Sequence, residues 1–180
     1  MPDKTSLDII IGTATGLSEE NPEYDAFYAG LFALGGNFSS RLVEEVREKR
    51  GLTYHAHTTL EAGTDGVESF WLANASFAPS LVGKGAKILK KEIEKWASRG
   101  IAAKELELKK ETIAGNFQVK LSTTGGLAKV ILDNAEQGRA KEYIDQYPRI
   151  IRALTLKEVN AAIKEYSRPD NLVTVSAGTI

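Results

Sequence analysis

The sequence predicts an α+β domain, a two-layer structure in which helices cover one face of a mixed, largely antiparallel sheet. Residues 52–62 alternate between two kinds of side chain and precede a turn signal, which indicates a hairpin of two strands. After Pro79 the apolar residues recur with helical spacing instead. The resulting order of strand, helices, hairpin, helices and strand differs from the regular alternation of a doubly wound parallel sheet.

Length and composition fit a single domain over residues 1–180. Hydrophobic residues make up 42% of the chain, which is enough for a sizeable core, and the 23 basic and 24 acidic side chains nearly cancel. This balance gives no electrostatic reason to expect nucleic acid or a membrane as a partner. The chain has no cysteine, so disulfides, zinc–thiolate sites and thiol nucleophiles are excluded.

The N-terminal third predicts a strand followed by two helices. The strand is Leu7–Ala14, with isoleucines at its centre. Asn21 is expected to cap the first helix, and Gly35–Gly36 to end it, because glycine readily adopts the left-handed conformation found at helix ends. A second helix is expected over Ser39–Lys49, with an apolar stripe that should be buried: Phe38, Leu42, Val43 and Val46.

The alternating segment predicts a strand with two chemically different faces. One face should pack under helices: Tyr54, Ala56, Thr58, Leu60 and Ala62. The other should lie away from the main helix layer as an open, polar face: Thr53, His55, His57, Thr59 and Glu61. Residues 63–66 form the turn signal, and Val67–Ser76 should be the partner strand.

The rest of the chain predicts five helices and a closing strand. Gly100 should end the first of these helices, Ser122–Gly126 should be a loop, and Thr155 with Glu158 has the form of a capping box. The predicted elements are helices from Pro79, over Ala103–Leu121, near Leu127–Glu136, near Glu142–Ile150 and from Thr155, and a strand over Leu172–Ala177.

Signatures of independent catalysis are missing. The sequence contains neither a P-loop nor a G-x-S-x-G elbow. His55 and His57 lie two residues apart on one strand face, but zinc sites usually require three or four protein ligands. Glu61 would lie ~13 Å along the strand, too far to share a metal with them. The two histidines are therefore interpreted as residues of a solvated or cleft-lining face, with an adventitious surface metal pair as the alternative.

Charged residues elsewhere have an ordinary interpretation as solvated helix faces. This applies to the acidic pairs Glu44–Glu45 and Glu92/Glu94, with Glu45 expected to pair with Lys49. From the charge pattern alone, Arg47 would be a surface residue paired with Glu44, and Tyr54 a half-buried strand residue.

One segment, however, carries a long and specific resemblance. It has a Gly-Gly turn followed by two ungapped stretches, Ser40-Arg41-Leu42 and Glu45-Val46-Arg47-Glu48-Lys49-Arg50-Gly51-Leu52-Thr53-Tyr54. This pattern resembles the signature of the C-terminal, inactive domain in the pitrilysin, insulinase and mitochondrial processing peptidase family. Less specific features follow in the family's order as far as Ala177, so the resemblance covers nearly the whole chain.

The resemblance implies a role beside a catalytic partner. Family members pair two related α+β domains, of which one carries zinc on an H-x-x-E-H motif and the other usually supplies an arginine and a tyrosine seven residues apart. Arg47 and Tyr54 match that pair and would bind a backbone carbonyl of the peptide substrate beside the zinc. This chain contains no H-x-x-E-H. It is therefore expected to bind no cofactor and to be no enzyme on its own, with zinc in the partner domain.

Two other interpretations remain open at this point. Some relatives of the family, such as core subunits of respiratory complexes, keep the fold as structural or docking proteins without catalysis, and fold alone cannot separate the two roles. The retained Arg47/Tyr54 pair favours the peptidase half. The third interpretation is an independent small binding domain. A catalytic half could be part of the same longer chain or a separate subunit.

Overall fold

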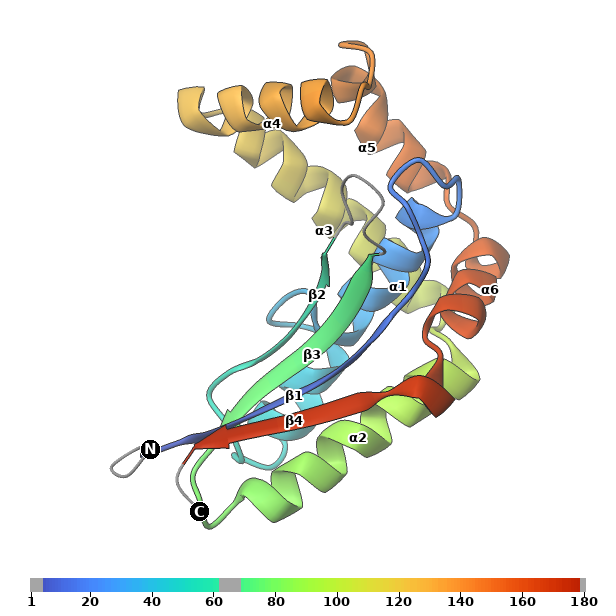
Figure 1. The fold of residues 1–180 in the computed structure, drawn as a ribbon. Helices are drawn as coiled ribbons and strands as arrows, with labels where there is room; N and C mark the ends of the chain where they lie inside the picture. Colours follow the sequence, from blue (N-terminus) through green and yellow to red (C-terminus); the bar gives the residue numbers. More distant parts are fainter. Residues whose placement is uncertain (1–4, 62–68, 179–180) are drawn as a thin grey trace.

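A computed structural model describes residues 5–61 and 69–178, and its sheet has four described strands. They are β1 (Leu7–Ala14), β2 (Ala56–Glu61), β3 (Phe70–Phe77) and β4 (Val173–Gly178). The spatial order is β2-β3-β1-β4, and every neighbouring pair is antiparallel (Figure 1). The predicted α+β class is confirmed, but the described sheet is purely antiparallel rather than mixed.

The register of the sheet divides its side chains into a core face and an open face. Ile9 of β1 pairs with Ala75, and Ile11 pairs with Ala73, so these residues all point to the core. Ile10 belongs to the opposite face, beside Val175 of β4. Strand pairing between distant segments, β1 with β4 above all, brings the first and the last described strands side by side (Figure 1).

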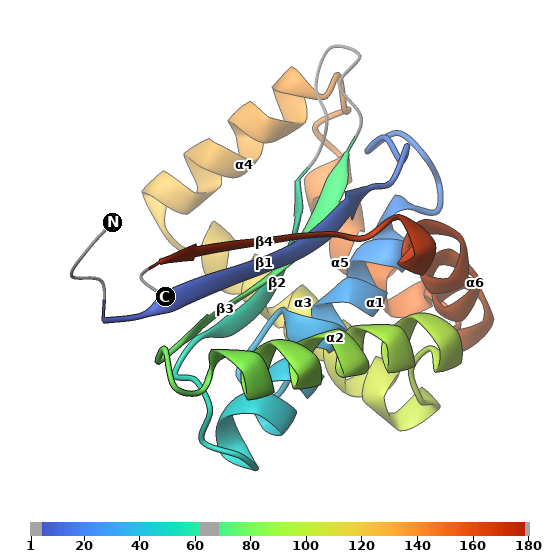
Figure 2. The ribbon, with the colours of Figure 1, turned by 60° about the horizontal axis from the view of Figure 1, so that its bottom comes forward.

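Helices cover the core face. The bounds of the described helices are α1 (Tyr24–Gly35), η1 (a π-helix, Val43–Glu48), α2 (Val82–Arg99), α3 (Ala103–Leu121), α4 (Thr124–Glu136), α5 (Tyr143–Ala153), α6 (Leu156–Tyr166) and η2 (a 3₁₀ turn, Pro169–Asn171). In Figure 2, α1, α2 and α6 lie below the strands, whereas α4 lies above them. The prediction of helices on one face is thus right for the main layer, and α4 projects away from that layer.

Two tryptophans and a phenylalanine form the centre of the core. Trp71 from β3, Trp96 from α2 and Phe27 from α1 are fully buried. The Trp96 ring lies 5.7 Å from Trp71 and 6.1 Å from Phe27, between centroids. Its Nε1 donates a hydrogen bond of 2.9 Å to the Gly30 carbonyl. Trp96 therefore joins α2 to α1 and to the sheet.

The first helix ends where predicted, but for another reason. Gly36 has φ −78°, an ordinary right-handed value, so no left-handed residue terminates α1. A Cβ on Gly36 would lie 2.3 Å from the Phe32 ring, which shows that close packing is what requires glycine here. At the other end, Asn21 does not cap the helix. Its side chain accepts a hydrogen bond from the Glu23 amide, and Asn21 lies two residues before Glu23, which is the actual N-cap.

The strand after Gly51 begins later than predicted. The pleat starts only at Ala56, so alternation does not govern residues 52–55. Thr53, which was expected on the open face, is buried, and its hydroxyl donates to the Ser76 carbonyl. From Ala56 the predicted faces are right: Thr58 and Leu60 point to the core side, and His57 to the open side. Residues 62–68, with the predicted turn, lie outside the described part.

The predicted capping box of the last helix is confirmed. The Glu158 amide donates to Thr155 Oγ1 at 3.3 Å, and the Thr155 amide donates to Glu158 Oε2 at 2.8 Å. Helix α4 begins at Thr124, so most of the loop expected over 122–126 is helical instead.

Removing the Thr155 hydroxyl should weaken α6 measurably. We expect Thr155→Ala to lower the free energy of unfolding by about 1 kcal/mol, because one helix N–H loses its acceptor. Thr124→Ala is the matched control, since the Thr124 hydroxyl makes no hydrogen bond among the described residues, and it should change stability by less than about 0.5 kcal/mol. Urea unfolding of both variants measures the difference, and equal stability would show that the box contributes nothing.

Candidate functional site

The segment with the family resemblance forms a tight corner on the surface. Leu42 and Val46 are buried and anchor η1 to the core. Gly51, at φ +59°, reverses the chain, and its amide donates to the Arg47 carbonyl at 2.8 Å. Leu52 is buried directly after the turn. The corner therefore fixes the backbone on both sides of the turn, although η1 is a π-helix rather than the expected α-helix.

Arg47 lies near the end of η1 with its side chain about one-third exposed, at 34%. Its Nε is 3.3 Å from Glu48 Oε1, and its guanidinium lies 5.6 Å from the centroid of the Phe38 ring. The predicted partner, Glu44, pairs with Lys49 instead, at 2.8 Å. Phe38 is 82% exposed, so its predicted burial is wrong. Because Phe38 lies on the surface and not in the core, the face of its ring is available for a cation–π contact with the Arg47 guanidinium.

The charges next to Arg47 are largely neutralised by each other. Lys49 donates to Glu45 at 2.6 Å, as predicted, and Arg50 donates to the Glu45 carboxylate and, at 2.6 Å, to the Glu45 carbonyl. Hydrogen bonds from Lys49 and then from Arg50 lower the pKa of Glu45 to about 2. Within the described residues, Arg47 has only Glu48 as an ion-pair partner, so its donors are the most available of this cluster.

Tyr54 is 94% exposed, so the expectation of a half-buried residue is wrong. It lies two residues before Ala56, the first residue of β2, and its inward neighbour Thr53 holds the backbone to His55 as well as to Ser76. The phenol therefore projects into solvent from a fixed backbone. No described hydrogen bond or ion pair joins Tyr54 to Arg47; the chain only holds them on the two sides of one turn.

The two histidines are neighbours, with ring centroids 4.5 Å apart. Burial and then the charge of His55 lower the pKa of His57, and His57 Nδ1 is buried without a partner. A third ligand is missing from their surroundings: across residues 5–61 and 69–178, no group of three His, Cys, Asp or Glu side chains could hold a metal ion. The residues present therefore do not fit a zinc site of the usual kind.

One carboxylate outside the corner was misplaced by the sequence interpretation. Glu92 is buried rather than solvated, because α2 turns it towards the interior. Lys95 lies 3.4 Å away, on the next turn of the helix, and supplies its charge partner.

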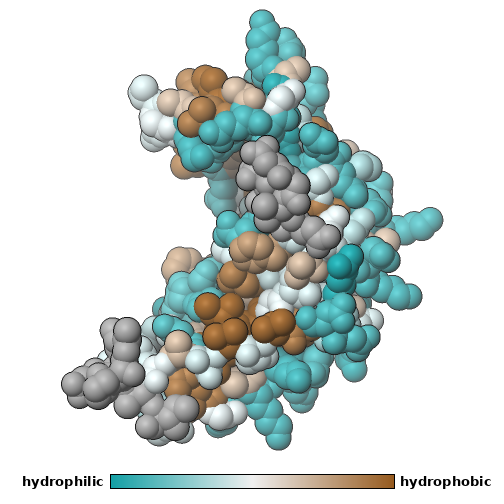
Figure 3. All heavy atoms as spheres, in the orientation of Figure 1, coloured by the Kyte–Doolittle hydropathy of each residue, from teal (hydrophilic) through white to brown (hydrophobic). Residues whose placement is uncertain are grey.

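The open sheet face is more apolar than predicted. Ile10, Phe70, Val173 and Val175 are exposed on β1, β3 and β4, with Val173 at 63%. Brown, hydrophobic atoms accordingly gather over the sheet in Figure 3. Helix α4 exposes three further apolar residues, namely Leu127, Ile131 and Leu132. Exposed apolar patches of this kind usually mark an interaction surface.

The sequence contained a signal for this surface. The run Ile9-Ile10-Ile11 lacks the alternation of a strand with one solvated face, and such a run indicates apolar contacts on both faces. Within β2, the predicted polar face holds for His57, Thr59 and Glu61, at one edge of the sheet. No helix among the described residues has the length and apolar composition needed to cross a membrane.

Comparison with known proteins places this geometry in a family. Residues 4–113 match the model of the peptidase M16 inactive domain. The chain belongs to this family. The family resemblance of the segment around Arg47 and Tyr54 is thereby confirmed, and the chain is an inactive domain of the zinc protease family.

Individual relatives agree with this assignment. A Helicobacter pylori protein named non-peptidase homolog YmxG is 24% identical over 79% of this chain and 32% of its own length. The uncharacterized zinc protease SCO5738 of Streptomyces coelicolor is 30% identical over 74% of the chain and 28% of its own length. The M16 chain thus spans about a third of the curated relatives that it matches.

Solved structures share the fold. The M16 inactive domain from Pseudomonas fluorescens superposes with a TM-score of 0.84 at 24% identity, over 98% of this chain and 41% of that one. The inactive peptidase domain of a zinc protease from Bordetella parapertussis gives a TM-score of 0.77 at 14% identity, over 95% and 92% of the two chains.

Proposed function

We propose that this M16 domain is the non-catalytic, substrate-binding half of a zinc metallopeptidase, and that Arg47 and Tyr54 bind the peptide in an active site completed by an H-x-x-E-H half. The exposure of both side chains on the two sides of the Gly51 turn carries the proposal. Both side chains are accessible to a molecule outside the chain, since Tyr54 is 94% exposed and Arg47 has only Glu48 as an ion-pair partner within the described residues.

The chemistry of the pair suits a peptide carbonyl. A guanidinium is a strong, charged donor, and a phenol adds a second donor from another direction. Donors aimed at a carbonyl oxygen position the peptide and stabilise the negative charge that develops on the oxygen during cleavage. Zinc, bound by the catalytic half, would supply the activated water. The role of Arg47 and Tyr54 is to hold the substrate against that centre.

The open sheet face supports pairing with a second domain. Ile10, Val173 and Val175 are apolar and exposed, and burying them would remove apolar area from water. The catalytic half, in the same longer chain or as a separate subunit, is the partner that we propose for this face.

Reconstitution tests the pairing. The isolated domain should contain no stoichiometric zinc by elemental analysis and should not cleave a fluorogenic peptide. Mixing it with the H-x-x-E-H half encoded with it should restore cleavage. Only the pair of halves brings the zinc of one half together with the peptide-binding donors of the other. One tightly bound zinc per isolated chain, or cleavage without the second half, would contradict this assignment.

A structural or docking role is the second candidate, because the name of YmxG describes a homologue without peptidase activity. It predicts that the two halves associate but do not cleave. Association measured by size-exclusion chromatography, together with the cleavage assay, separates the two roles.

A further inference from the structure

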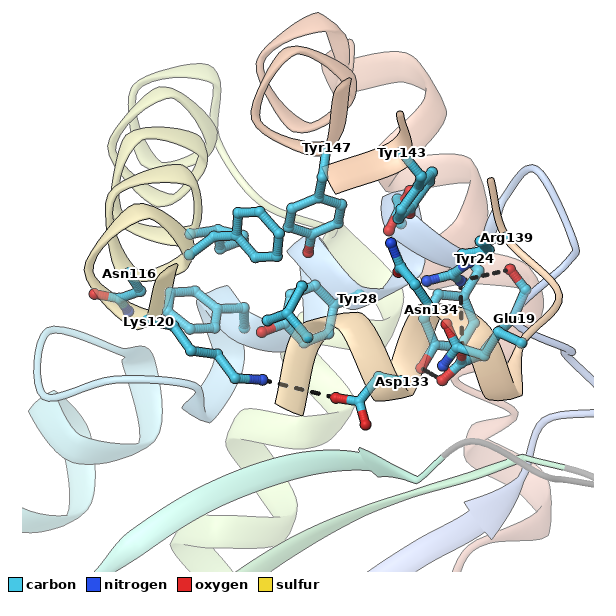
Figure 4. A pocket seen from close by; sticks show the side chains of 16 residues that line it. Glu19, Tyr24, Tyr28, Asn116, Lys120, Asp133, Asn134, Arg139, Tyr143 and Tyr147 are labelled. Atoms are coloured by element: carbon cyan, nitrogen blue, oxygen red, sulfur yellow. Dashed lines mark hydrogen bonds and ion pairs between the residues drawn. The ribbon is translucent and has the colours of Figure 1, made fainter. Parts of the chain in front are cut away.

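A second concave site lies between the helices, away from the corner that carries Arg47 and Tyr54. Residues from α1, α3, α4, α5 and two adjoining loops enclose a cavity of about 330 Å³, and none of them belongs to the η1–β2 segment. This volume is within the range of sites for small molecules. The cavity has polar groups at both ends and aromatic rings between them (Figure 4).

Four tyrosines line this cavity. In Figure 4, Tyr28 and Tyr147 occupy its middle, with Tyr24 and Tyr143 towards one end. The Tyr147 ring lies between those of Phe117 and Tyr143, tilted against both, at centroid distances of 4.6 Å and 5.9 Å. The faces of aromatic rings attract cations, and grouped rings are the usual cage for ammonium groups.

The cavity already holds one cation of the chain itself. The Arg139 guanidinium lies 4.4 Å from the centroid of the Tyr143 ring and 3.3 Å from a Glu19 oxygen. At the opposite end, Lys120 lies 3.8 Å from Asp133 (Figure 4). Both cations are thus matched by a carboxylate, and within residues 5–61 and 69–178 no cation lies over the Tyr28 or Tyr147 ring.

Asp25 is the carboxylate left over. It lies on α1 and lines the cavity, and within the described residues no hydrogen bond or ion pair reaches its side chain. Burial raises the pKa of Asp25, and after burial its charge raises the pKa of Tyr28. The Arg139 charge offsets that of Asp25 only in part, and the lining carries three carboxylates against two cations, so the cavity keeps an excess of negative charge.

Two side-chain amides at the C-terminal end of α4, Asn134 and the C-cap Gln137, also have atoms without partners there. Asn134 is only 7% exposed, and its Nδ2 has no hydrogen bond. Gln137 Oε1 is likewise buried and unpaired. Unpaired buried polar atoms are costly, so a donor and an acceptor directed into one cavity indicate a ligand that pairs with both.

We propose that this cavity binds a small aliphatic amine that also carries an oxygen acceptor. Asp25 and Gln137 Oε1 accept hydrogen bonds from the ammonium group, the Tyr28 and Tyr147 rings surround it, and Asn134 donates to the oxygen. The same chemistry is found in a free amino alcohol and in a lysine side chain of a peptide, whose nearest acceptor is a backbone carbonyl.

Titration calorimetry with matched probes tests the proposal on the 180-residue chain. The chain should bind 5-aminopentan-1-ol at least about tenfold more tightly than pentane-1,5-diol, which lacks the charge. Nα-acetyl-lysine amide, titrated in parallel, separates the two sources: tighter binding of this probe assigns the site to a peptide side chain, and weaker binding assigns it to a free amine.

Asp25→Asn should lower the affinity for the amino alcohol by at least about tenfold. It should leave the fold intact, because no hydrogen bond or ion pair within the described residues is lost with the Asp25 carboxylate. Asp145→Asn on α5 is the control, since that carboxylate is exposed and outside the cavity, and it should bind like the unaltered chain. If Asp25→Asn fails to fold, Gln137→Met replaces it, with a loss of at least about threefold. Equal binding of the amine and the diol, or no loss in the variant that folds, would overturn the proposal.

Discussion

Arg47→Ala should lower kcat/KM for peptide cleavage by the paired enzyme by roughly ten- to a hundredfold. One charged donor to a peptide carbonyl is worth about 1.5–3 kcal/mol, and the side chain has only Glu48 as an ion-pair partner within the described residues. Tyr54→Phe should also reduce cleavage, by less, because a neutral donor is lost. Arg47→Lys should rescue little, since an ammonium cannot reproduce the planar fork of a guanidinium.

Arg50→Ala is the control for that experiment. Arg50 belongs to the same corner, but its donors are occupied by Glu45, so we expect its loss to leave cleavage unchanged. Association of the two halves should survive in every variant, because neither Arg47 nor Tyr54 is part of the core. Cleavage at the unaltered rate by both Arg47→Ala and Arg50→Ala would refute the substrate-binding role and favour the docking role.

Trp96→Ala should lower the free energy of unfolding of the domain by about 3–5 kcal/mol. Its ring is fully buried between Phe27 and Trp71, so the substitution leaves a large cavity where α1, α2 and the sheet meet. The hydrogen bond from Trp96 Nε1 to the Gly30 carbonyl is lost as well.

Phe38→Ala is the matched control for the core substitution. It also removes an aromatic ring, but one that is 82% exposed, so we expect a change of about 0.5 kcal/mol or less. Urea unfolding followed by circular dichroism compares the two variants. A loss of less than about 1 kcal/mol for Trp96→Ala would show that Trp96 is not central to the core.

Long periodic segments were predicted well from the sequence. The bounds of β1 and α3 agree residue for residue with the prediction, and the Thr155 capping box and the Gly100 helix end are confirmed. These features depend on neighbours close in the chain, through side-chain period, capping and turn chemistry. Local interactions of this kind can be predicted from the sequence, because the residues that make them are close together in the chain.

The errors occur where a distant part of the chain decides the outcome. Thr53 is buried because Ser76, on another strand, offers it a hydrogen-bond acceptor. Gly35 is required by packing rather than by a left-handed turn, because a Cβ there would lie 2.6 Å from Thr58 Cγ2 on β2. The cavity lined by Asp25 could not be predicted from the sequence, because its lining residues come from separate helices whose faces meet only in the folded chain.

By itself, the sequence determined the α+β class, most of the elements and the family, and it singled out Arg47 and Tyr54. Only the tertiary structure decided that Tyr54 projects into solvent, that Phe38 packs on Arg47, and that an apolar sheet face stays open beside α4. The physical reason is that exposure is a property of the assembled surface. A side-chain pattern fixes which residues share a face, but the packing of distant elements fixes which faces are covered.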